Sequence, residues 1–167
     1  MSYVELSFIG SKSSLTSRAI QLFSAGPVSH VDAVEPLTGL LWGARFDEVG
    51  GLPRGFWPRP ASYIAKETIH VVIRVPCTAA QQRKFWEITR KAQGTPYDWR
   101  GILAFGFGQN WHKRGTAFCS EAQRDHLQAA GILPKDFFER GYKTTPMMLL
   151  TALTARDDTK IVLRQGC

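Results

Sequence analysis

The sequence has few of the features that mark several large classes of protein. Its 167 residues include only three cysteines, Cys77, Cys119 and Cys167, and no Cys-x-x-Cys pair. This scarcity argues against a disulfide framework or a zinc site and suits a reducing compartment. No apolar run approaches the roughly 18 residues that span a bilayer, and residues 1–10 lack the pattern of a signal peptide. We therefore expect a cytoplasmic protein without a transmembrane segment.

Long runs of basic residues are also missing, although lysine and arginine outnumber aspartate and glutamate by 21 to 14. The net charge of +7 favours an anionic partner such as nucleic acid or another anionic polymer, but the positive residues are scattered. The hydrophobic fraction of 44% and charged fraction of 21% are typical of a globular protein. The length predicts a single domain over residues 1–167.

Hydrophobic periodicity predicts a mixture of strands and helices without an internal repeat. Breakers at Gly50, Gly51 and several prolines predict a loop over 50–60, and 97–118 has no clean periodicity. The resulting fold class is α+β, with strands and helices partly segregated. The expected strands are 3–8, 29–34, 40–46, 68–75 and 160–164, and the expected helices are 15–25, 79–93, 119–130 and 147–155.

Cys119 stands where a helical pattern begins, in the segment Thr-Ala-Phe-Cys-Ser-Glu. The free amides and dipole at a helix N-terminus favour a thiolate there and can also stabilise an oxyanion. Two interpretations remain open on this residue alone. Free cysteine is most often a small buried apolar side chain, and the alternative is a catalytic nucleophile.

A cysteine nucleophile needs a base within hydrogen-bonding reach, and the chain has four histidines. His30 follows a helix and a Gly-Pro stop and begins a strand, a position from which side chains often project into a cleft. His70 lies inside a strand, His112 in the aromatic loop, and His126 well past Cys119 on the same predicted helix. Spacing alone does not choose among them.

Three motifs together resemble the circularly permuted branch of the NlpC-like papain-fold cysteine peptidases, a superfamily that includes lecithin retinol acyltransferase relatives. They are SHVDAV at 29–34, GTPYDWRGI at 94–102 and FCSE at 118–121. The resemblance implies one permuted papain-like domain, with a central antiparallel sheet packed against helices and a nucleophile at a helix N-terminus. No cofactor or metal is implied.

Carried over position by position, the resemblance makes Cys119 the nucleophile and His30 the general base. Tyr97 matches the tyrosine that helps bind the oxyanion or substrate. Asp98 and Glu121 also match common positions, and we interpret both as structural. In this family a polar residue on the strand after the histidine usually orients the imidazole, but this chain has Gly43 near that position.

Several groups could replace the orienting residue, and the sequence does not select one. The nearby acids are Asp32, Glu35, Asp47 and Glu48, and a backbone carbonyl or a water could also serve. Aromatic residues around the expected cleft indicate core packing or an apolar groove, and Arg45, Arg54 and Arg59 are either solvated or anion-binding. The aromatic residues are Trp42, Phe46, Phe56, Trp57, Trp99, Phe105, Phe107 and Trp111.

The sequence therefore predicts a thiol-dependent hydrolase or acyltransferase acting on small peptide or acyl substrates through a covalent acyl-enzyme. The family suggests cell-wall peptides or lipid-linked acyl groups, and a wall substrate would require release by lysis, a phage-encoded role or a cytoplasmic recycling role. The alternative is a non-catalytic binding module of the same fold for an anionic polymer or nucleic acid. It rests on the +7 charge, the aromatic loop and the missing orienting residue.

Overall fold

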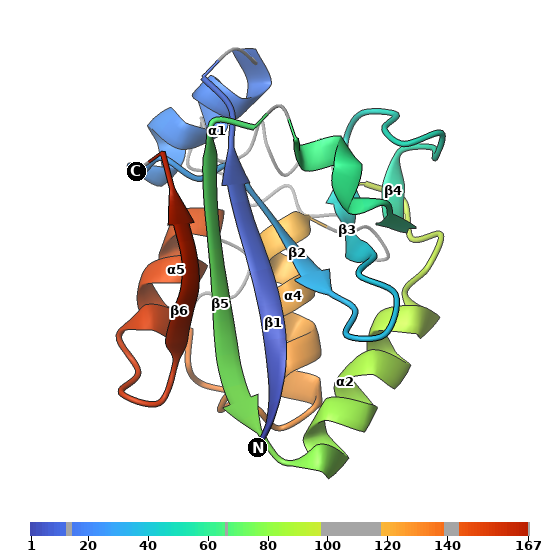
Figure 1. Cartoon of the computed structure of the whole chain (residues 1–167), viewed down its shortest axis with the longest axis vertical. Helices are drawn as coiled ribbons and strands as arrows, with labels where there is room; N and C mark the ends of the chain where they lie inside the picture. Colours follow the sequence, from blue (N-terminus) through green and yellow to red (C-terminus); the bar gives the residue numbers. More distant parts are fainter. Residues whose placement is uncertain (13–14, 66, 98–117, 139–143, 167) are drawn as a thin grey trace.

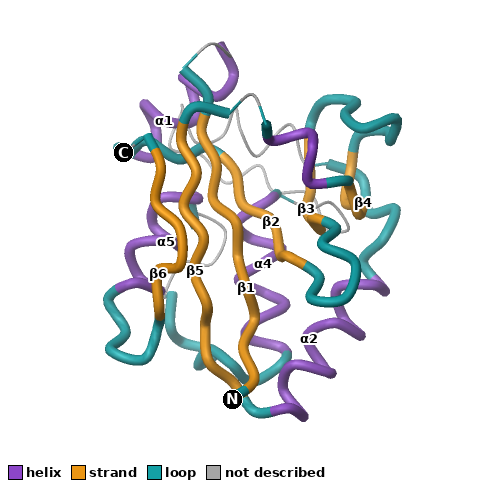
Figure 2. Tube along the Cα trace, viewed as in Figure 1, coloured by secondary structure: helices purple, strands orange, loops and turns teal. Residues whose placement is uncertain are grey.

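The computed structural model describes residues 1–12, 15–65, 67–97, 118–138 and 144–166. Within them the fold is α+β, and the strands form one antiparallel six-stranded sheet in the order β4-β3-β2-β1-β5-β6 (Figures 1 and 2). The strands are β1 (Ser2–Gly10), β2 (His30–Val34), β3 (Leu41–Arg45), β4 (Gly55–Arg59), β5 (Ile69–Cys77) and β6 (Lys160–Gln165).

The helices α2, α4 and α5 cover one side of the sheet, with α4 behind β1 and β2 in the view of Figure 1. No helix in the described segments has the length and apolar character needed to cross a bilayer. The helices are α1 (Leu15–Ser24), α2 (Ala79–Lys91), α4 (Cys119–Ala129) and α5 (Pro146–Thr154), and the short 3-10 helix η1 is Ala61–Ile64.

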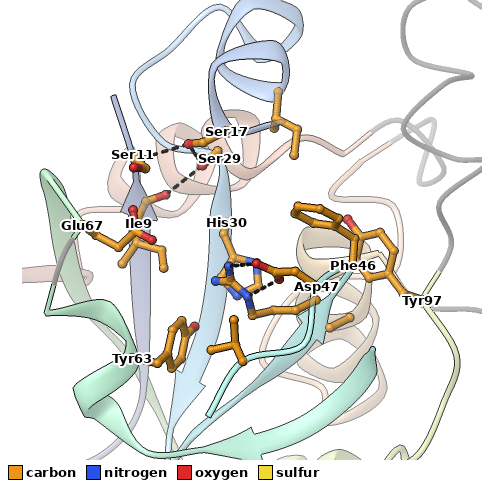
Figure 3. Close-up of a pocket in the computed structure, with 14 residues that line it drawn as sticks. Ile9, Ser11, Ser17, Ser29, His30, Phe46, Asp47, Tyr63, Glu67 and Tyr97 are labelled. Atoms are coloured by element: carbon orange, nitrogen blue, oxygen red, sulfur yellow. Dashed lines mark hydrogen bonds and ion pairs between the residues drawn. The ribbon is translucent and has the colours of Figure 1, made fainter. Parts of the chain in front are cut away.

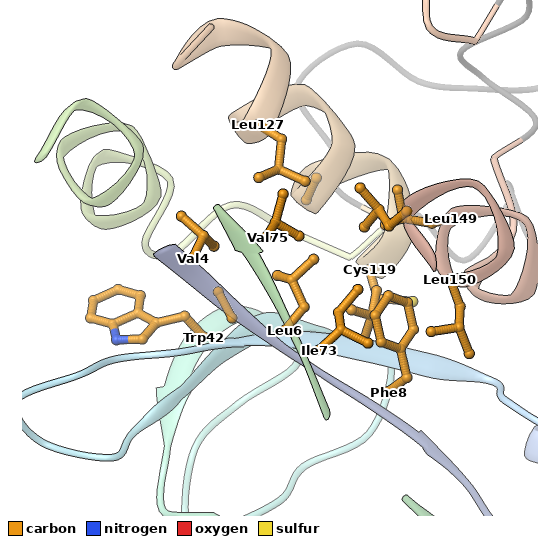
Figure 4. Close-up of a cluster of buried hydrophobic side chains, with 14 of the residues drawn as sticks. Val4, Leu6, Phe8, Trp42, Ile73, Val75, Cys119, Leu127, Leu149 and Leu150 are labelled. Carbon is orange, nitrogen blue, oxygen red and sulfur yellow. The ribbon is translucent and has the colours of Figure 1, made fainter. Parts of the chain in front are cut away.

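The core forms between the helices and the apolar face that the neighbouring strands β1 and β5 share. Val4, Leu6 and Phe8 alternate along β1 and are at most 1% exposed, because every second side chain of a strand points to the same face. Figure 4 shows this face against the helices, with Cys119 at the start of α4 among the buried side chains. The cross-strand partners on β5 are Val75, Ile73 and Val71.

Local capping explains why α2 and α5 begin where the sequence predicts. The Thr78 side chain accepts from the Gln81 amide while the Gln81 side chain accepts from the Thr78 amide, which is a complete capping box. Thr145 accepts from the Met148 amide ahead of Pro146, which occupies the first turn. The predicted start of α4 at Cys119 is also confirmed.

The prediction of an unbroken loop over 50–60 is wrong, because β4 forms within it. Five residues of β4 pair with β3, and on the other side the Phe56 amide donates to Thr95 O at 2.9 Å. Pro58 is tolerated because β4 is the edge strand of the sheet. The buried Arg59 side chain holds the segment by donating to the carbonyls of Gly43, Pro53, Gly55 and Trp57.

Candidate active site

His30 opens β2 and is held by a carboxylate on its own strand. Its Nε2 lies 2.8 Å from Asp32 Oδ1, and the two residues are 9% and 1% exposed. Residues two apart on a strand share a face, so the His-Val-Asp order places the carboxylate beside the ring. The orienting group that the sequence did not select is therefore Asp32.

Asp32 is the centre of a small polar network. Its other oxygen, Oδ2, accepts a hydrogen bond from the Tyr63 hydroxyl, and the Arg45 guanidinium lies 4.9 Å from the centre of the Tyr63 ring. Burial raises the pKa of Asp32, but the charge and hydrogen bond of His30, the Tyr63 hydrogen bond and the charge of Arg45 lower it to a value below the usual range. The carboxylate is thus held in its ionised form.

Gly43 leaves the space that Asp32 occupies. A Cβ atom added to Gly43 would lie 1.8 Å from Asp32 Oδ1, so no larger residue fits without displacing the carboxylate. In the sequence, Gly43 stands where the family usually has the orienting residue. Its lack of a side chain leaves room for Asp32, on β2, to contact His30 instead. None of the other three candidate acids forms a hydrogen bond with His30 in the described structure: Asp47 pairs with Arg45, Glu35 pairs with Arg90, and Glu48 is exposed.

Cys119 is the first residue of α4 and lies next to His30, although the two are far apart in the sequence. Cys119 makes a side-chain hydrogen bond with the imidazole, so its sulfur lies within hydrogen-bonding reach of the ring. Because Asp32 engages Nε2, Nδ1 is the ring nitrogen left to face Cys119. Cys119 is also 1% exposed and packs at the margin of the apolar core, so both interpretations of this residue describe part of its environment (Figure 4).

The protonation of His30 follows from these neighbours. Burial lowers the pKa of the imidazole, but the charges of Asp32 and Cys119 and the hydrogen bonds to both outweigh burial and raise it from 6.5 to about 9. The ring is therefore an imidazolium at neutral pH. The arrangement is a buried Cys–His–Asp row in which a proton is stored on the central residue.

Tyr97 lies beside the start of α4. Its ring centroid is 6.1 Å from that of Phe118, the residue before Cys119, and 6.3 Å from that of Phe46. The neighbouring Asp98 of the same motif lies outside the described residues, whereas Glu121 is buried in the first turn of α4. The structure thus brings Tyr97, His30 and Cys119 to one region.

A cavity of about 300 Å³ opens onto this region (Figure 3). His30 and Tyr97 line it, whereas Cys119 is not among its lining residues. In Figure 3 serine side chains and Glu67 lie to one side of His30, and Phe46 and Tyr97 lie to the other. The cavity therefore has a polar wall and an aromatic wall that meet at the histidine.

The remaining candidate residues have structural roles or lie outside the described part. His70 Nε2 lies 2.9 Å from Ser7 Oγ, and His126 packs between the rings of Phe56 and Phe85. Trp42 and Phe56 are core residues, Arg54 is exposed, and His112, Trp99, Phe105, Phe107 and Trp111 fall among the residues that the structure does not describe. Within the described ranges, no group of three histidine, cysteine or acidic side chains is placed to bind a metal ion.

The site therefore combines an α+β fold, a buried Cys–His–Asp row and an adjoining cavity. The chain is similar over 99% of its length to 98% of the chain of metalloprotein yiiX from Escherichia coli O157:H7, a DUF1105 protein, with a TM-score of 0.63 and 21% sequence identity. At this identity the likeness shows a common fold and says nothing about activity. No family model and no curated protein matches the sequence.

Proposed function

We propose that the chain is a thiol-dependent hydrolase that cleaves an amide, ester or thioester through an acyl-enzyme on Cys119. The observation that carries this proposal is the position of His30 between Asp32 and Cys119. A nucleophile, a base and a group that orients the base form the arrangement that nucleophilic catalysis requires. The permuted papain-like topology that the motifs suggest would account for the order of the three residues in the chain.

In the first half of the proposed reaction, the Cys119 sulfur attacks the substrate carbonyl carbon and forms a C–S bond. The imidazolium of His30 gives its proton to the leaving amine or alcohol, and the C–N or C–O bond breaks. The Asp32 carboxylate holds the ring through Nε2, so the proton is delivered from Nδ1. Backbone amides in the first turn of α4 and the Tyr97 hydroxyl would stabilise the developing oxyanion.

In the second half, neutral His30 accepts a proton from water, and the resulting hydroxide attacks the acyl-enzyme carbonyl. The C–S bond breaks, a carboxylic acid leaves, and the thiolate and imidazolium are restored. Transfer to an alcohol or amine in place of water would make the same site an acyltransferase.

The alternative is a binding module for an anionic polymer. One argument for it is the lack of a residue that orients His30, and the hydrogen bond between His30 and Asp32 weakens that argument. The net charge of +7 still supports it. Affinity for nucleic acid that falls steeply with salt and is unchanged by Cys119→Ala would favour the binding module.

The proposed function is tested by thiol labelling at neutral pH. In a Cys77→Ser/Cys167→Ser protein, we expect iodoacetamide to modify Cys119 faster than in the same protein with His30→Ala, because the His30 imidazolium stabilises the reactive thiolate. The comparison is made between two proteins at one pH, so it measures the effect of His30 on the rate.

Cys77 provides the matched control. Burial raises the pKa of its thiol, so a protein retaining only Cys77 should react slowly at neutral pH, with or without His30. If the labelling rate of Cys119 is the same whether or not His30 is present, the proposal is wrong. Screening the wild type and Cys119→Ala proteins against peptidoglycan fragments and acyl esters would then identify the scissile bond.

A further inference from the structure

Most of the charged side chains that line the cavity have an oppositely charged partner in the protein. The ionisable residues that line it include His30, Arg45, Asp47 and Glu67. Arg45 and Asp47 form a two-bond ion pair at 2.8 and 2.9 Å, and His30 is paired with Asp32 behind the wall. Those three charges are therefore compensated by protein groups, and among the described lining residues Glu67 is the one charged side chain left without an oppositely charged partner.

One oxygen of Glu67 is buried without a partner. Its Oε2 atom is shielded from solvent and accepts no hydrogen bond from the residues that the structure describes. A carboxyl oxygen in this position forfeits hydration without gaining a compensating donor, which costs free energy unless a bound group supplies the donor. Such orphaned polar atoms are uncommon in native structures and call for a specific explanation.

The serine side chains extend the same polar wall. Ser17 Oγ accepts from the Ser11 amide at 2.9 Å and lies 2.6 Å from Ser29 Oγ. Figure 3 shows these serines above Glu67, with Ile9 between Glu67 and His30. Hydroxyl and carboxylate oxygens on one wall suit a ligand rich in hydrogen-bond donors and do not suit a long hydrocarbon chain.

The geometry points to an ammonium-bearing acyl compound as the substrate class. In this inference, which rests on the proposed hydrolase function, the Glu67 carboxylate binds the substrate ammonium group while the scissile carbonyl lies at His30 and Cys119. The cavity of about 300 Å³ holds a short aminoacyl or peptide unit, with the aromatic side formed by Phe46 and Tyr97 left for the side chain or leaving group. Fatty acyl esters are poor substrates because they would bury an uncompensated carboxylate.

The test compares L-alanine 4-nitroanilide with its N-acetyl derivative, which has the same scissile amide but no ammonium group. Hydrolysis consumes one water and releases 4-nitroaniline, which is followed by its colour. We expect the wild type to prefer the free amine and Glu67→Gln to lose about 10- to 100-fold in kcat/KM on that substrate, with the N-acetyl rate unchanged. Glu48→Gln, which removes an exposed carboxylate, should behave as wild type.

A binding measurement separates this inference from the proposed function. Cys119→Ala protein, which cannot form an acyl-enzyme, is titrated by NMR with L-alaninamide, and the double variant with Glu67→Gln is titrated in parallel. Binding that requires Glu67 without any turnover by the wild type would support the ammonium site while the hydrolase proposal fails. Turnover without a preference for the free amine, or no binding of alaninamide in either variant, would overturn the ammonium site.

Discussion

At the scale of single residues, three groups meet at the carboxylate of Asp32. The His30 imidazole and the Tyr63 hydroxyl each donate a hydrogen bond to one of its oxygens, and the Arg45 guanidinium acts through its charge. Asp32 is buried, so these partners replace the water that an exposed carboxylate would have. The position of His30 therefore depends on Asp32, and its protonation depends on Asp32 together with Cys119.

We predict that Asp32→Asn lowers the pKa of His30 from about 9. The amide keeps the shape of the carboxylate but removes the negative charge that favours the imidazolium, while burial continues to oppose it. The measurement is an NMR titration of the histidine ring. Asp47→Asn is the control, because Asp47 pairs with Arg45 and forms no hydrogen bond with His30, so its effect on the titration should be smaller. Equal shifts in the two variants would contradict the central role of Asp32.

We predict that Gly43→Ala disturbs the same pair by crowding. The new Cβ would lie 1.8 Å from Asp32 Oδ1 and 3.1 Å from Val31 O, so the carboxylate must move. Overpacking of this kind costs about 1–3 kcal/mol of unfolding free energy, measured by urea denaturation. The labelling rate of Cys119 at neutral pH should fall toward that of the His30→Ala protein.

The control for Gly43→Ala is Ala33→Gly, a change on the opposite face of β2 from Asp32. It should lower stability through lost packing and strand flexibility while leaving the labelling rate unchanged. A Gly43→Ala protein that is destabilised but labels like the wild type would show that Asp32 does not depend on the space at Gly43.

The sequence could indicate Cys119 and His30 but not the residue that orients the histidine. Four acids lie close together along the chain. The contacts that identify Asp32 among them, the pairing of β2 with β3 and the hydrogen bond from Tyr63, are visible only in the structure. The alternation in His-Val-Asp placed Asp32 on the correct face, so this signal was available. Glu67 and Tyr63 carry no comparable motif, because their roles arise from long-range packing against the cavity.

At the scale of elements, predictions succeeded where the cause is local. The capping box at Thr78 and the Thr145-Pro146 pair are decided within four residues, and both helices begin as expected. β4 was missed because its stability depends on partners distant in the sequence, β3 and the Arg59 guanidinium, whereas the local glycines and prolines favour a loop. Arg59 was expected to be solvated or anion-binding, and it is instead buried among backbone carbonyls.

We predict that Arg59→Lys loosens β4. Arginine supplies two Nη groups that each reach two carbonyls, and a lysine ammonium on a flexible stem cannot hold all four. Loss of the buried charge-assisted bonds should cost about 2 kcal/mol. Hydrogen exchange at the Phe56 amide, which donates to Thr95 O, should accelerate more than exchange in β1. Arg54→Lys, at an exposed position, is the control and should change neither.

At the scale of the whole molecule, two buried histidines have opposite pKa shifts. Burial lowers the pKa of His126 from 6.5 to about 4, and the charge of Asp125 only partly opposes this. The pKa of His30 is raised to about 9 by Asp32 and Cys119 despite burial. The fold thus stabilises a neutral imidazole at one site and an imidazolium at another, so stability must fall on both sides of the pH at which an unfolded histidine titrates.

We predict that unfolding free energy has its maximum near pH 6.5. As pH falls from 6.5 toward 4, His126 becomes protonated in the unfolded chain but stays neutral in the folded chain. This difference lowers the free energy of unfolding by roughly 3 kcal/mol in total. As pH rises from 6.5 through 9, the unfolded chain has already released the His30 proton that the folded chain retains, so the stabilisation from that imidazolium is lost. Urea denaturation across this range measures both limbs.

Each limb belongs to one histidine, so substitutions should flatten them separately. His126→Gln keeps a polar group near Thr89 and removes the titration, so the acid limb should become shallower while the alkaline limb is unchanged. His30→Gln should flatten the alkaline limb, because the group whose proton stabilises the fold at neutral pH is gone. If the acid limb of His126→Gln matches that of the wild type, carboxylates such as Asp32, whose pKa is lowered in the fold, would be its cause.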